Sequence, residues 1–397
     1  MQKLYSLKFV LTLMVVASAL TAMLFALILS FFGGNIFRDV DSRTQYFDAL
    51  IDVIDDRFIG DADIDELLIS AKRATVEALD DEWSFYLTAE EYERRLESMR
   101  NQFVGIGVEV IIEEDSGDIR ILNVHRNSGA YEAGILVGDI IVSVDGESTV
   151  GLALDELREA LRRPIDDTAI VGVIRESFDD ILEKVVVYRV VFMDPVSYMM
   201  LDGNIGYVSL RNFDTGARYG FINAVEYLIE RGAVAFIYDV RSNPGGQLAE
   251  MTGILDFLLP EGVIFISVST DGGENRIYSD ESFLDMPTAV LVNSNSHSAA
   301  EYFAALLREY DYAYTIGEQT TGKNRLQTTI ALPCGGAVHL STGEYLTKNR
   351  VSLREVGGFT PEFIVEMSED DYLMLRRGEL DIHDDVQLQM ALSLLTN

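Results

Sequence analysis

The second half of the chain alternates short apolar segments of strand-like composition with longer segments of helical spacing. Strands are expected at 233–240, 288–293 and 313–317, and helices near 247–259 and 299–310. A strand that leads through a helix into another strand favours a parallel sheet with helices packed on it. Residues 195–397 are therefore predicted to form an α/β core whose sheet is mainly parallel.

The middle of the chain has a different pattern. From Phe103 onward, short β-branched runs are separated by Gly, Asp and Ser, with one helical stretch near 153–163. This pattern ends at Pro195, where a new series of strands begins. A small β-rich domain is expected over 102–194, and the helical spacing and acidity of the residues before it predict a helical lead-in at 38–101.

A long apolar run lies near the N-terminus. Residues 9–32 carry no charge and are mostly apolar, which is long enough to cross roughly 30 Å of bilayer hydrocarbon. Lysines precede this run, whereas basic and acidic residues mix after it, so the N-terminus is expected in the cytoplasm. Residues 1–37 are predicted to be a cytoplasmic tail and a transmembrane helix. The alternative is a signal peptide cleaved after the small residues at 17–19.

Composition argues against several partners and cofactors. The chain has 31 Lys and Arg against 65 Asp and Glu, a formal net charge of -34, so no broad basic face and no nucleic-acid partner is expected. Cys334 is the only cysteine, which excludes an intramolecular disulfide and a cysteine-cluster metal site. The four histidines are scattered and form no H-E-x-x-H motif. Neither a metal nor another cofactor is expected.

The segment "SNSHSAAEYF", residues 294–303, joins a predicted strand to a predicted helix. Ser298 is then expected at the carboxyl end of a buried strand and at the N-terminus of a helix. Backbone N–H groups and the helix dipole can stabilise an anion there, as the oxyanion of acyl transfer requires. Because Ser298-x-x-Glu301 is also a capping box, these residues alone allow either a helix cap or a nucleophile.

The segment "YTIGEQTTGKNRLQ" places Lys323 in a glycine-containing loop directly after a predicted buried strand. A serine nucleophile needs a base, and burial lowers the pKa of a lysine so that its neutral amine can accept a proton. A hydrogen bond from Gln327 would fix the direction of the amine. The alternatives are a solvated loop lysine and a base at His297, but adjacent residues at a helix start point in different directions.

These two segments resemble motifs of the carboxyl-terminal processing proteases, also called tail-specific proteases. "SHSAAE" is similar to the family's "SASASE", and "GEQTTGKNRLQ" is similar to its "GxxTFGKGxxQ", with the lysine 25 positions after the serine. The resemblance implies that Ser298 is the nucleophile, Lys323 its base and Gln327 the third member of a triad. Departures from the family pattern occur within these motifs at His297, Thr321 and Asn324, and later in the chain at Lys348 and Asn349.

Other segments extend the resemblance from about residue 40 to the C-terminus. "YDVRSNPGGQL" at 238–248 resembles the family's "DLRxNPGG" turn, which implies that Gly245 or Gly246, with the Ala299 N–H, holds the oxyanion. Similar segments are "ALDDEWSFYLTAEEY" at 78–92, "IGYVSLRNF" at 205–213 and "GFTPEFIVEM" at 358–367.

The β-rich middle domain resembles a PDZ domain. The resemblance rests on "FVGIGVEV" and "NSGAYEAGILVGDIIVSVDG". It implies that a peptide C-terminus is added as a strand, with its carboxylate held by loop amides. Glycine allows backbone N–H groups to approach such an anion closely. The loop expected to do so contains Val104, Gly105, Ile106 and Gly107.

Residues and resemblance together predict a membrane-anchored Ser/Lys endopeptidase that cleaves protein substrates near or from their C-termini outside the cytoplasmic membrane. Its partners are then proteins or peptides with free C-termini, and the resemblance further suggests a homodimer formed through the helical lead-in. Two other functions remain open: a catalytically inactive PDZ scaffold, and a different serine hydrolase, such as an esterase. The three triad positions argue against the first, and the PDZ-like domain argues against the second.

Overall fold

The computed structural model describes residues 40–113, 116–176 and 180–396, and the chain separates into two compact units between Ala78 and Leu79. The first unit contains the helices α2 (Val40–Arg57) and α3 (Ile64–Glu77). Helix α3 begins where the Asp63 carboxylate accepts a hydrogen bond from the Glu66 N–H at 3.1 Å, which is an N-cap. Both helices lie in the segment that the residue spacing predicts to be helical.

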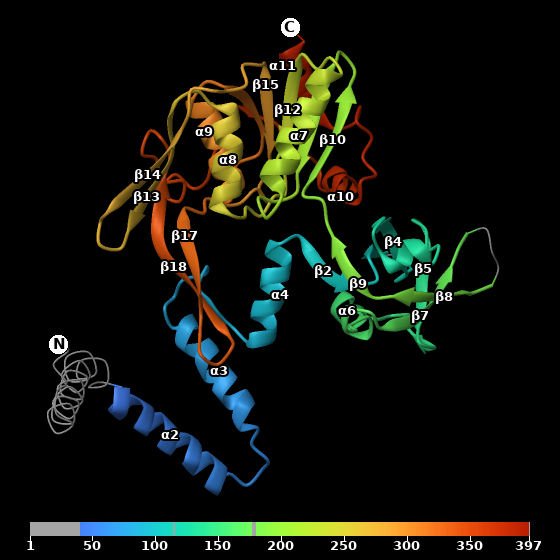
Figure 1. Cartoon of the computed structure of the whole chain (residues 1–397), viewed down its shortest axis with the longest axis vertical. Helices are drawn as coiled ribbons and strands as arrows, with labels where there is room; N and C mark the ends of the chain where they lie inside the picture. The colour runs from blue at the N-terminus through green and yellow to red at the C-terminus, as the bar shows by residue number, and fades with distance from the viewer. Residues whose placement is uncertain (1–39, 114–115, 177–179, 397) are drawn as a thin grey trace, which may run out of the picture. The chain divides into compact units, whose positions relative to one another are not determined.

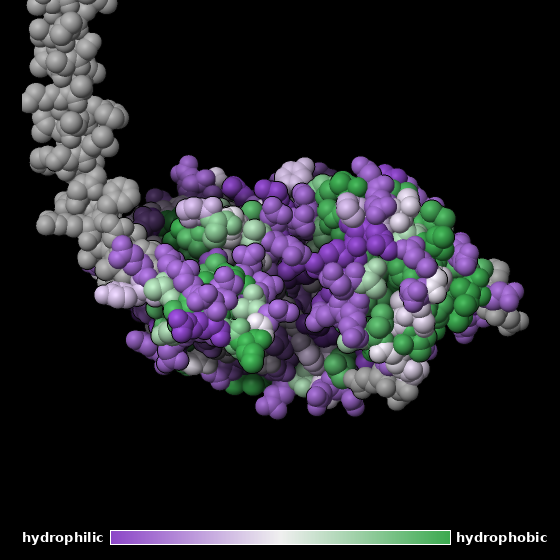
Figure 2. Space-filling model, turned by 90° about the horizontal axis from the view of Figure 1, so that it is seen from below, coloured by the Kyte–Doolittle hydropathy of each residue, from purple (hydrophilic) through white to green (hydrophobic). Residues whose placement is uncertain are grey.

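The predicted transmembrane segment at 9–32 lies outside the described residues. Among the helices of the described ranges, none combines the length and the apolar composition that a membrane span requires. The first unit does carry an apolar helix face, because α2 exposes Tyr46, Leu50 and Val53 at helical spacing. In the space-filling view of Figure 2, hydrophilic residues cover much of the visible face and apolar residues form separate groups.

The second unit contains a six-stranded sheet, of which β10, β12 and β15 are labelled in Figure 1. Its order is β10-β11-β12-β15-β16-β19, and only the pair β10 and β11 is antiparallel. The strands are β10 (Val196–Leu201), β11 (Ile205–Leu210), β12 (Ala235–Asp239), β15 (Thr288–Val292), β16 (Ala313–Gly317) and β19 (Phe363–Ile364). This arrangement confirms the predicted α/β core with a mainly parallel sheet.

Helices cover both faces of this sheet, which explains why β12 and β15 are buried along their whole length. Phe236 and Tyr238 of β12 pack into one core with three helices, whereas Ile237 between them packs into a second core with α11 (Val386–Leu395). The three helices of the first core are α7 (Ala217–Glu230), α8 (Leu248–Leu258) and α9 (Ala299–Glu309). Side chains that alternate along the strand therefore serve two cores.

A second, antiparallel sheet was not predicted from the sequence. It has the order β1-β18-β13-β14, and β17 pairs with β18 beside this path. The strands are β1 (Phe85–Leu87), β13 (Gly262–Ser269), β14 (Glu274–Ser279), β17 (Arg325–Ala331) and β18 (Ala337–Leu346). Phe85 pairs with His339, so this sheet brings the end of the lead-in against a strand near the C-terminus. No local pattern in the sequence indicates that pairing.

The β-rich middle domain has its own sheet, with the order β3-β4-β5-β7-β8, and its own core around Ile121, Val171 and Tyr188. The strands are β3 (Val108–Ile112), β4 (Ile119–Val124), β5 (Ile140–Val144), β7 (Thr168–Ile174) and β8 (Leu182–Val187), with the helix α6 (Leu154–Ala160) and a short β6 (Glu147–Ser148). A ribbon of β2 (Gln102–Gly105) and β9 (Arg189–Phe192) joins this domain to the rest of the unit. Strand β3 lies at an edge of the sheet.

Candidate active site

Ser298 lies in the sharp turn between β15 and α9. Its backbone has φ 53° and ψ -113°, a conformation that non-glycine residues rarely adopt and that is common at functional sites. Two bonds join this turn to the segment after β12: the His297 N–H donates to the Asn243 carbonyl at 2.9 Å, and the Ser296 hydroxyl donates to the Val240 carbonyl at 2.8 Å. The structure therefore places Ser298 at the carboxyl end of a buried strand, beside a helix N-terminus.

Only one half of the capping box forms at this helix. The Glu301 carboxylate accepts a hydrogen bond from the Ser298 N–H at 2.8 Å, but the Ser298 hydroxyl accepts none from the N–H groups of α9. Ser298 instead lines a cavity of about 660 Å³, close to the Tyr345 hydroxyl. The structure therefore shows no helix cap formed by the Ser298 hydroxyl.

The Glu301 side chain is completely buried and connects the serine turn to the lysine loop. Besides the Ser298 N–H, its carboxylate accepts hydrogen bonds from the Thr320 hydroxyl at 2.6 Å, the Lys323 N–H at 3.0 Å and the Gly322 N–H. A buried carboxylate is stable only when such donors replace water. The sequence pattern around Glu301 indicates only a capping residue, because its other partners come from a loop whose position the sequence does not show.

Lys323 lies at the end of that loop, just before β17. Its Nζ is 4.4 Å from the centroid of the Trp83 ring, and the residue is half-buried. Burial lowers the pKa of the Lys323 amine, and the positive charge of Arg95 lowers it further, although Glu301 and Asp81 oppose the shift. Lys323 is therefore not a fully solvated loop residue, and its environment favours the neutral form that a general base needs.

The three predicted triad residues line the same cavity. Gln327, however, donates from Nε2 to the Ser341 hydroxyl at 3.4 Å. Within the described part of the chain, no hydrogen bond joins Ser298 to Lys323 or Lys323 to Gln327. The structure thus brings the three side chains to one site without linking them, and catalytic hydrogen bonds often form only in a substrate complex.

The glycine turn after β12 packs directly against the serine. Gly245 has φ 93°, and a Cβ atom at this position would lie 2.9 Å from the Ser298 Cβ. At Gly246, with φ 150°, a Cβ would lie 2.4 Å from the carbonyl carbon of Phe213. Both positions need glycine because the backbone conformation and the available space exclude a side chain.

The two glycines differ in what their N–H groups do. The Gly245 N–H donates to Asn243 Oδ1 at 2.8 Å, so it is already used inside the turn. Among the backbone and side-chain hydrogen bonds of residues 40–113, 116–176 and 180–396, none uses the N–H of Gly246 or of Ala299. Of the three predicted oxyanion donors, Gly246 and Ala299 are the ones with a free N–H.

Helix α4 (Ala89–Met99) forms one wall of the cavity. It begins with a complete capping box, in which Thr88 and Glu91 each accept a hydrogen bond from the other's N–H. The side chains that face the cavity share one helix face: Tyr92, Arg95, Leu96 and Met99. No motif in the sequence of this helix indicates a part in the site. Its helical spacing was visible, but the partner of its inner face was not.

The other candidate chemistries find no support. The His297 backbone is bonded to Asn243, and in the described residues no hydrogen bond joins the His297 ring to Ser298. The described ranges also contain no group of three or more His, Cys, Asp or Glu residues arranged to hold a metal ion.

The predicted peptide-binding loop connects β2 to β3. Val104 and Gly105 pair with β9, and Gly107 has φ 84°. The N–H groups of Ile106 and Gly107 donate to no backbone carbonyl among the described residues. Because β3 has a free edge next to this loop, the geometry has the parts that strand addition and carboxylate binding require.

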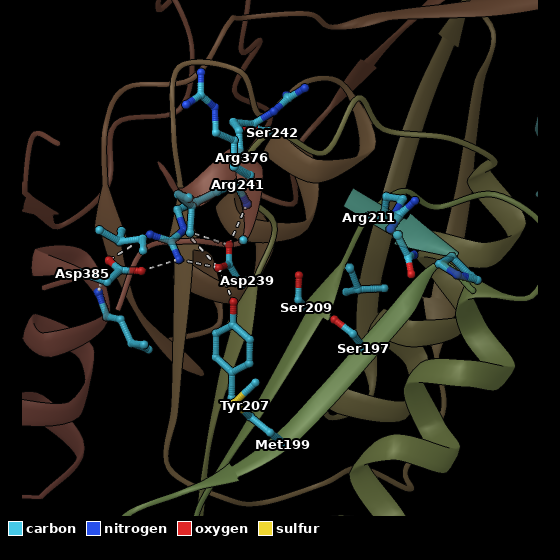
Figure 3. A pocket seen from close by; sticks show the side chains of 18 of the residues that line it. Ser197, Met199, Tyr207, Ser209, Arg211, Asp239, Arg241, Ser242, Arg376 and Asp385 are labelled. Atoms are coloured by element: carbon cyan, nitrogen blue, oxygen red, sulfur yellow. Dashed lines mark hydrogen bonds and ion pairs between the residues drawn. The ribbon is translucent and has the colours of Figure 1, made fainter. Parts of the chain in front are cut away.

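A second cavity of about 760 Å³ lies behind the glycine turn and does not include Ser298. Figure 3 shows Arg241 between two carboxylates, with Nη2 2.6 Å from Asp239 and 2.8 Å from Asp385. The Tyr207 hydroxyl also donates to Asp239, at 2.6 Å. These buried partners satisfy one another, so they connect the end of β12 to the start of α11 and give no sign of a reactive group.

Comparison with known proteins places these features in a wider context. The model of the peptidase family S41 matches residues 204–365, and a PDZ domain model matches residues 120–175. A carboxy-terminal-processing protease of Bartonella bacilliformis is 30% identical over 84% of this chain and 74% of its own length. A carboxyl-terminal-processing protease of Synechocystis is 28% identical over 80% and 74%.

The fold has solved counterparts as well. A structure from Bacteroides fragilis, assigned to the S41 proteases, covers 82% of this chain and 90% of its own with a TM-score of 0.57 and 18% identity. The likeness at this identity concerns the fold alone.

We expect Glu301→Gln to slow the reaction of Ser298 with a fluorophosphonate probe by about tenfold to a hundredfold, because a displaced reacting group loses rate on that scale. The amide NH₂ of glutamine would face N–H donors that now point at a carboxylate. Labelling rates, followed by intact mass, measure this. Ser294→Ala, at an exposed serine of the same turn, is the control and should react like the wild type. Undiminished labelling of a folded Glu301→Gln protein would contradict the positioning role.

Proposed function

Because this chain belongs to peptidase family S41, a family of serine-type peptidases, we propose that it is a Ser/Lys endopeptidase that cleaves protein substrates near or from their C-termini. The observation that carries the proposal is the shared cavity of Ser298 and Lys323, beside the free N–H groups of Gly246 and Ala299. A nucleophile, a partly desolvated amine and two converging donors are the groups that acyl transfer needs.

In the proposed acylation step, the Ser298 hydroxyl attacks the scissile carbonyl carbon while the neutral Lys323 amine accepts the hydroxyl proton. The carbonyl oxygen becomes an oxyanion that accepts hydrogen bonds from the Gly246 and Ala299 N–H groups. The Lys323 ammonium then donates its proton to the leaving amine, and the C–N bond breaks to give an ester at Ser298.

In the proposed deacylation step, a water molecule attacks the ester carbonyl and Lys323 accepts a proton from that water. The second tetrahedral intermediate uses the same two N–H donors. Collapse of this intermediate returns the proton from Lys323 to Ser298 and releases the new carboxylic acid, which loses its own proton to solvent. Gln327 can orient the amine once its side chain turns from Ser341 toward Lys323.

The PDZ domain is proposed to select substrates by their C-termini. An extended peptide would pair with the free edge of β3, while the Ile106 and Gly107 N–H groups bind the terminal carboxylate.

The apolar segment at 9–32 supports a second proposal, that the chain is anchored in the cytoplasmic membrane with its catalytic domains outside. The apolar face of α2 supports the expected homodimer through the lead-in. Native and denaturing mass spectrometry of detergent-extracted protein tests both points. A mature chain beginning near residue 20 would refute the anchor, and a purely monomeric native mass would refute the dimer.

Ser298→Ala should abolish cleavage, and Lys323→Ala should lower kcat/KM by about 10²- to 10⁴-fold, the usual contribution of a general base. The wild-type rate should rise with pH, because the neutral fraction of Lys323 grows as pH passes through its pKa. Since burial lowers that pKa, the rise should level off below the ordinary titration range of lysine. Cleavage of an unfolded protein, measured by mass spectrometry across pH, provides the test.

Lys348→Ala is the matched control for this experiment. The Lys348 Nζ is also held, by the Glu309 carbonyl at 3.2 Å and the Tyr310 ring, but it does not line the catalytic cavity. Its removal should leave the pH profile unchanged. A pH-independent rate, or full activity of Lys323→Ala, would exclude the lysine as the base, and full activity of Ser298→Ala would exclude the serine.

Full-length Ser298→Ala protein should bind a peptide with an apolar, free C-terminus at least about tenfold more tightly than the same peptide amidated. Gly107→Ala should remove this difference, because a Cβ there would lie 2.1 Å from the Ser128 Cβ. Gly151→Ala is the control, since Gly151 also has positive φ, 81°, but no atom lies within 4 Å of its added Cβ. Isothermal titration calorimetry measures these affinities. Equal binding of both peptides would refute carboxylate capture by this loop.

A further inference from the structure

One arginine in the catalytic cavity has no acidic partner. Arg95 projects from α4 into the cavity that contains Ser298 and Lys323. Its neighbour Arg94 is engaged in an exposed ion pair with Glu90 at 2.6 Å, but Arg95 forms no ion pair with any carboxylate of the described residues. This difference separates Arg95 from an ordinary surface arginine of the same helix.

The bonds that Arg95 does make leave most of its donors unused. Its Nη2 lies 3.3 Å from His339 Nε2, and its guanidinium carbon lies 5.4 Å from the centroid of the Phe85 ring. The Arg95 Nε is buried and has no hydrogen-bond acceptor. A guanidinium carries five N–H donors in a planar fork, so a fixed and partly desolvated guanidinium with free donors is suited to bind a planar anion.

The charged groups around Arg95 do not compensate its positive charge. Burial and the nearby positive charges lower the pKa of His339 to about 4, so this ring is neutral and contributes no negative charge. The Asp214 carboxylate interacts with Arg95 only at longer range, and burial raises its pKa to about 6. The other arginine of the cavity, Arg325, is paired with Asp81 at 3.1 Å. An unpaired partly buried cation is unfavourable until an anion arrives.

Apolar side chains stand next to this cation. Tyr92, Leu96 and Met99 lie on the same face of α4 as Arg95, and Met251 and Phe265 also line the cavity. Such a surface can hold an apolar side chain, while a bidentate pair of hydrogen bonds holds a carboxylate beside it.

We propose that Arg95 binds a peptide carboxylate inside the catalytic cavity, next to an apolar side chain held by α4. The inference rests on the proposed function of this cavity and names a second feature of its substrates. The carboxylate is either the C-terminus of the bound peptide or an acidic side chain near the scissile bond. In the first case cleavage occurs a few residues from the chain end, and in the second the cleavage site itself is acidic.

Trp83 makes this site observable without cleavage. It is the only tryptophan of the chain, and its ring contacts Lys323, so its fluorescence should respond to a peptide in the catalytic cavity. The experiment uses the full chain with Ser298→Ala and N-acetylated hexapeptides of alanine with a C-terminal leucine. One peptide has a free C-terminus, one is amidated, and two further amidated peptides carry a single internal Glu or Gln.

We expect a carboxylate-bearing peptide to bind at least about tenfold more tightly than its neutral counterpart, as charged hydrogen bonds do. Arg95→Gln should remove this preference, Arg95→Lys should restore part of it, and Arg94→Gln should retain it. A preference for the free C-terminus identifies the first source, and a preference for internal Glu identifies the second. Loss of the Arg95 charge would raise the pKa of Lys323, and a more fully charged Lys323 would favour a carboxylate, so this coupling cannot account for a lost preference.

A carboxylate preference that survives Arg95→Gln would overturn the inference, as would a Trp83 signal that responds to none of the peptides. If calorimetry detects a preference for the carboxylate-bearing peptide but Trp83 fluorescence does not change, the carboxylate binds at the PDZ loop. This result would also contradict carboxylate binding by Arg95. Wild-type protein without peptidase activity, combined with an Arg95-dependent Trp83 response, would refute the proposed function and leave the carboxylate site standing.

Discussion

The buried carboxylate of Glu301 is the interaction on which the geometry of the site depends. It accepts hydrogen bonds from the backbone of Ser298 and from the loop that carries Lys323. These segments follow the paired strands β15 and β16, and the Thr321 hydroxyl also donates to the Ser294 carbonyl at 3.0 Å. Because a buried charge must retain its donors, moving either loop would leave the carboxylate without compensation. The nucleophile and the amine are thus positioned by a group that takes no part in the bond changes.

A second constraint is the close approach of two backbones. The turn after β12 reaches Ser298 only because Gly245 has no side chain, and the backbone of Phe213 holds this turn from the other side, through the Gly245 carbonyl and the Gln247 N–H. The Arg241 network with Asp239 lies just before the turn and anchors the strand end. The oxyanion donors therefore come from a rigid part of the sheet, which suits electrostatic preorganisation.

Much of this organisation could be predicted from the sequence because its signals are local. The α/β core follows from alternating strands and helices, and the place of Ser298 follows from one strand and one helix. The antiparallel sheet could not be predicted, since Phe85 and His339 pair across 254 positions. The sequence around either residue does not indicate which strand it pairs with. The same reason hid Arg95 and Trp83, whose position in the site depends on that pairing.

The pairing of β1 with β18 also bears on the order of events during synthesis. In a growing chain, the lead-in at 38–101 is synthesised long before β17 and β18. Until those strands exist, neither Lys323 nor α4 can take its final position at the catalytic cavity. Contacts between such distant segments form late and slowly. The completed cavity therefore appears only after nearly the whole chain has been made, which keeps a peptidase of this design inert while it is being translated.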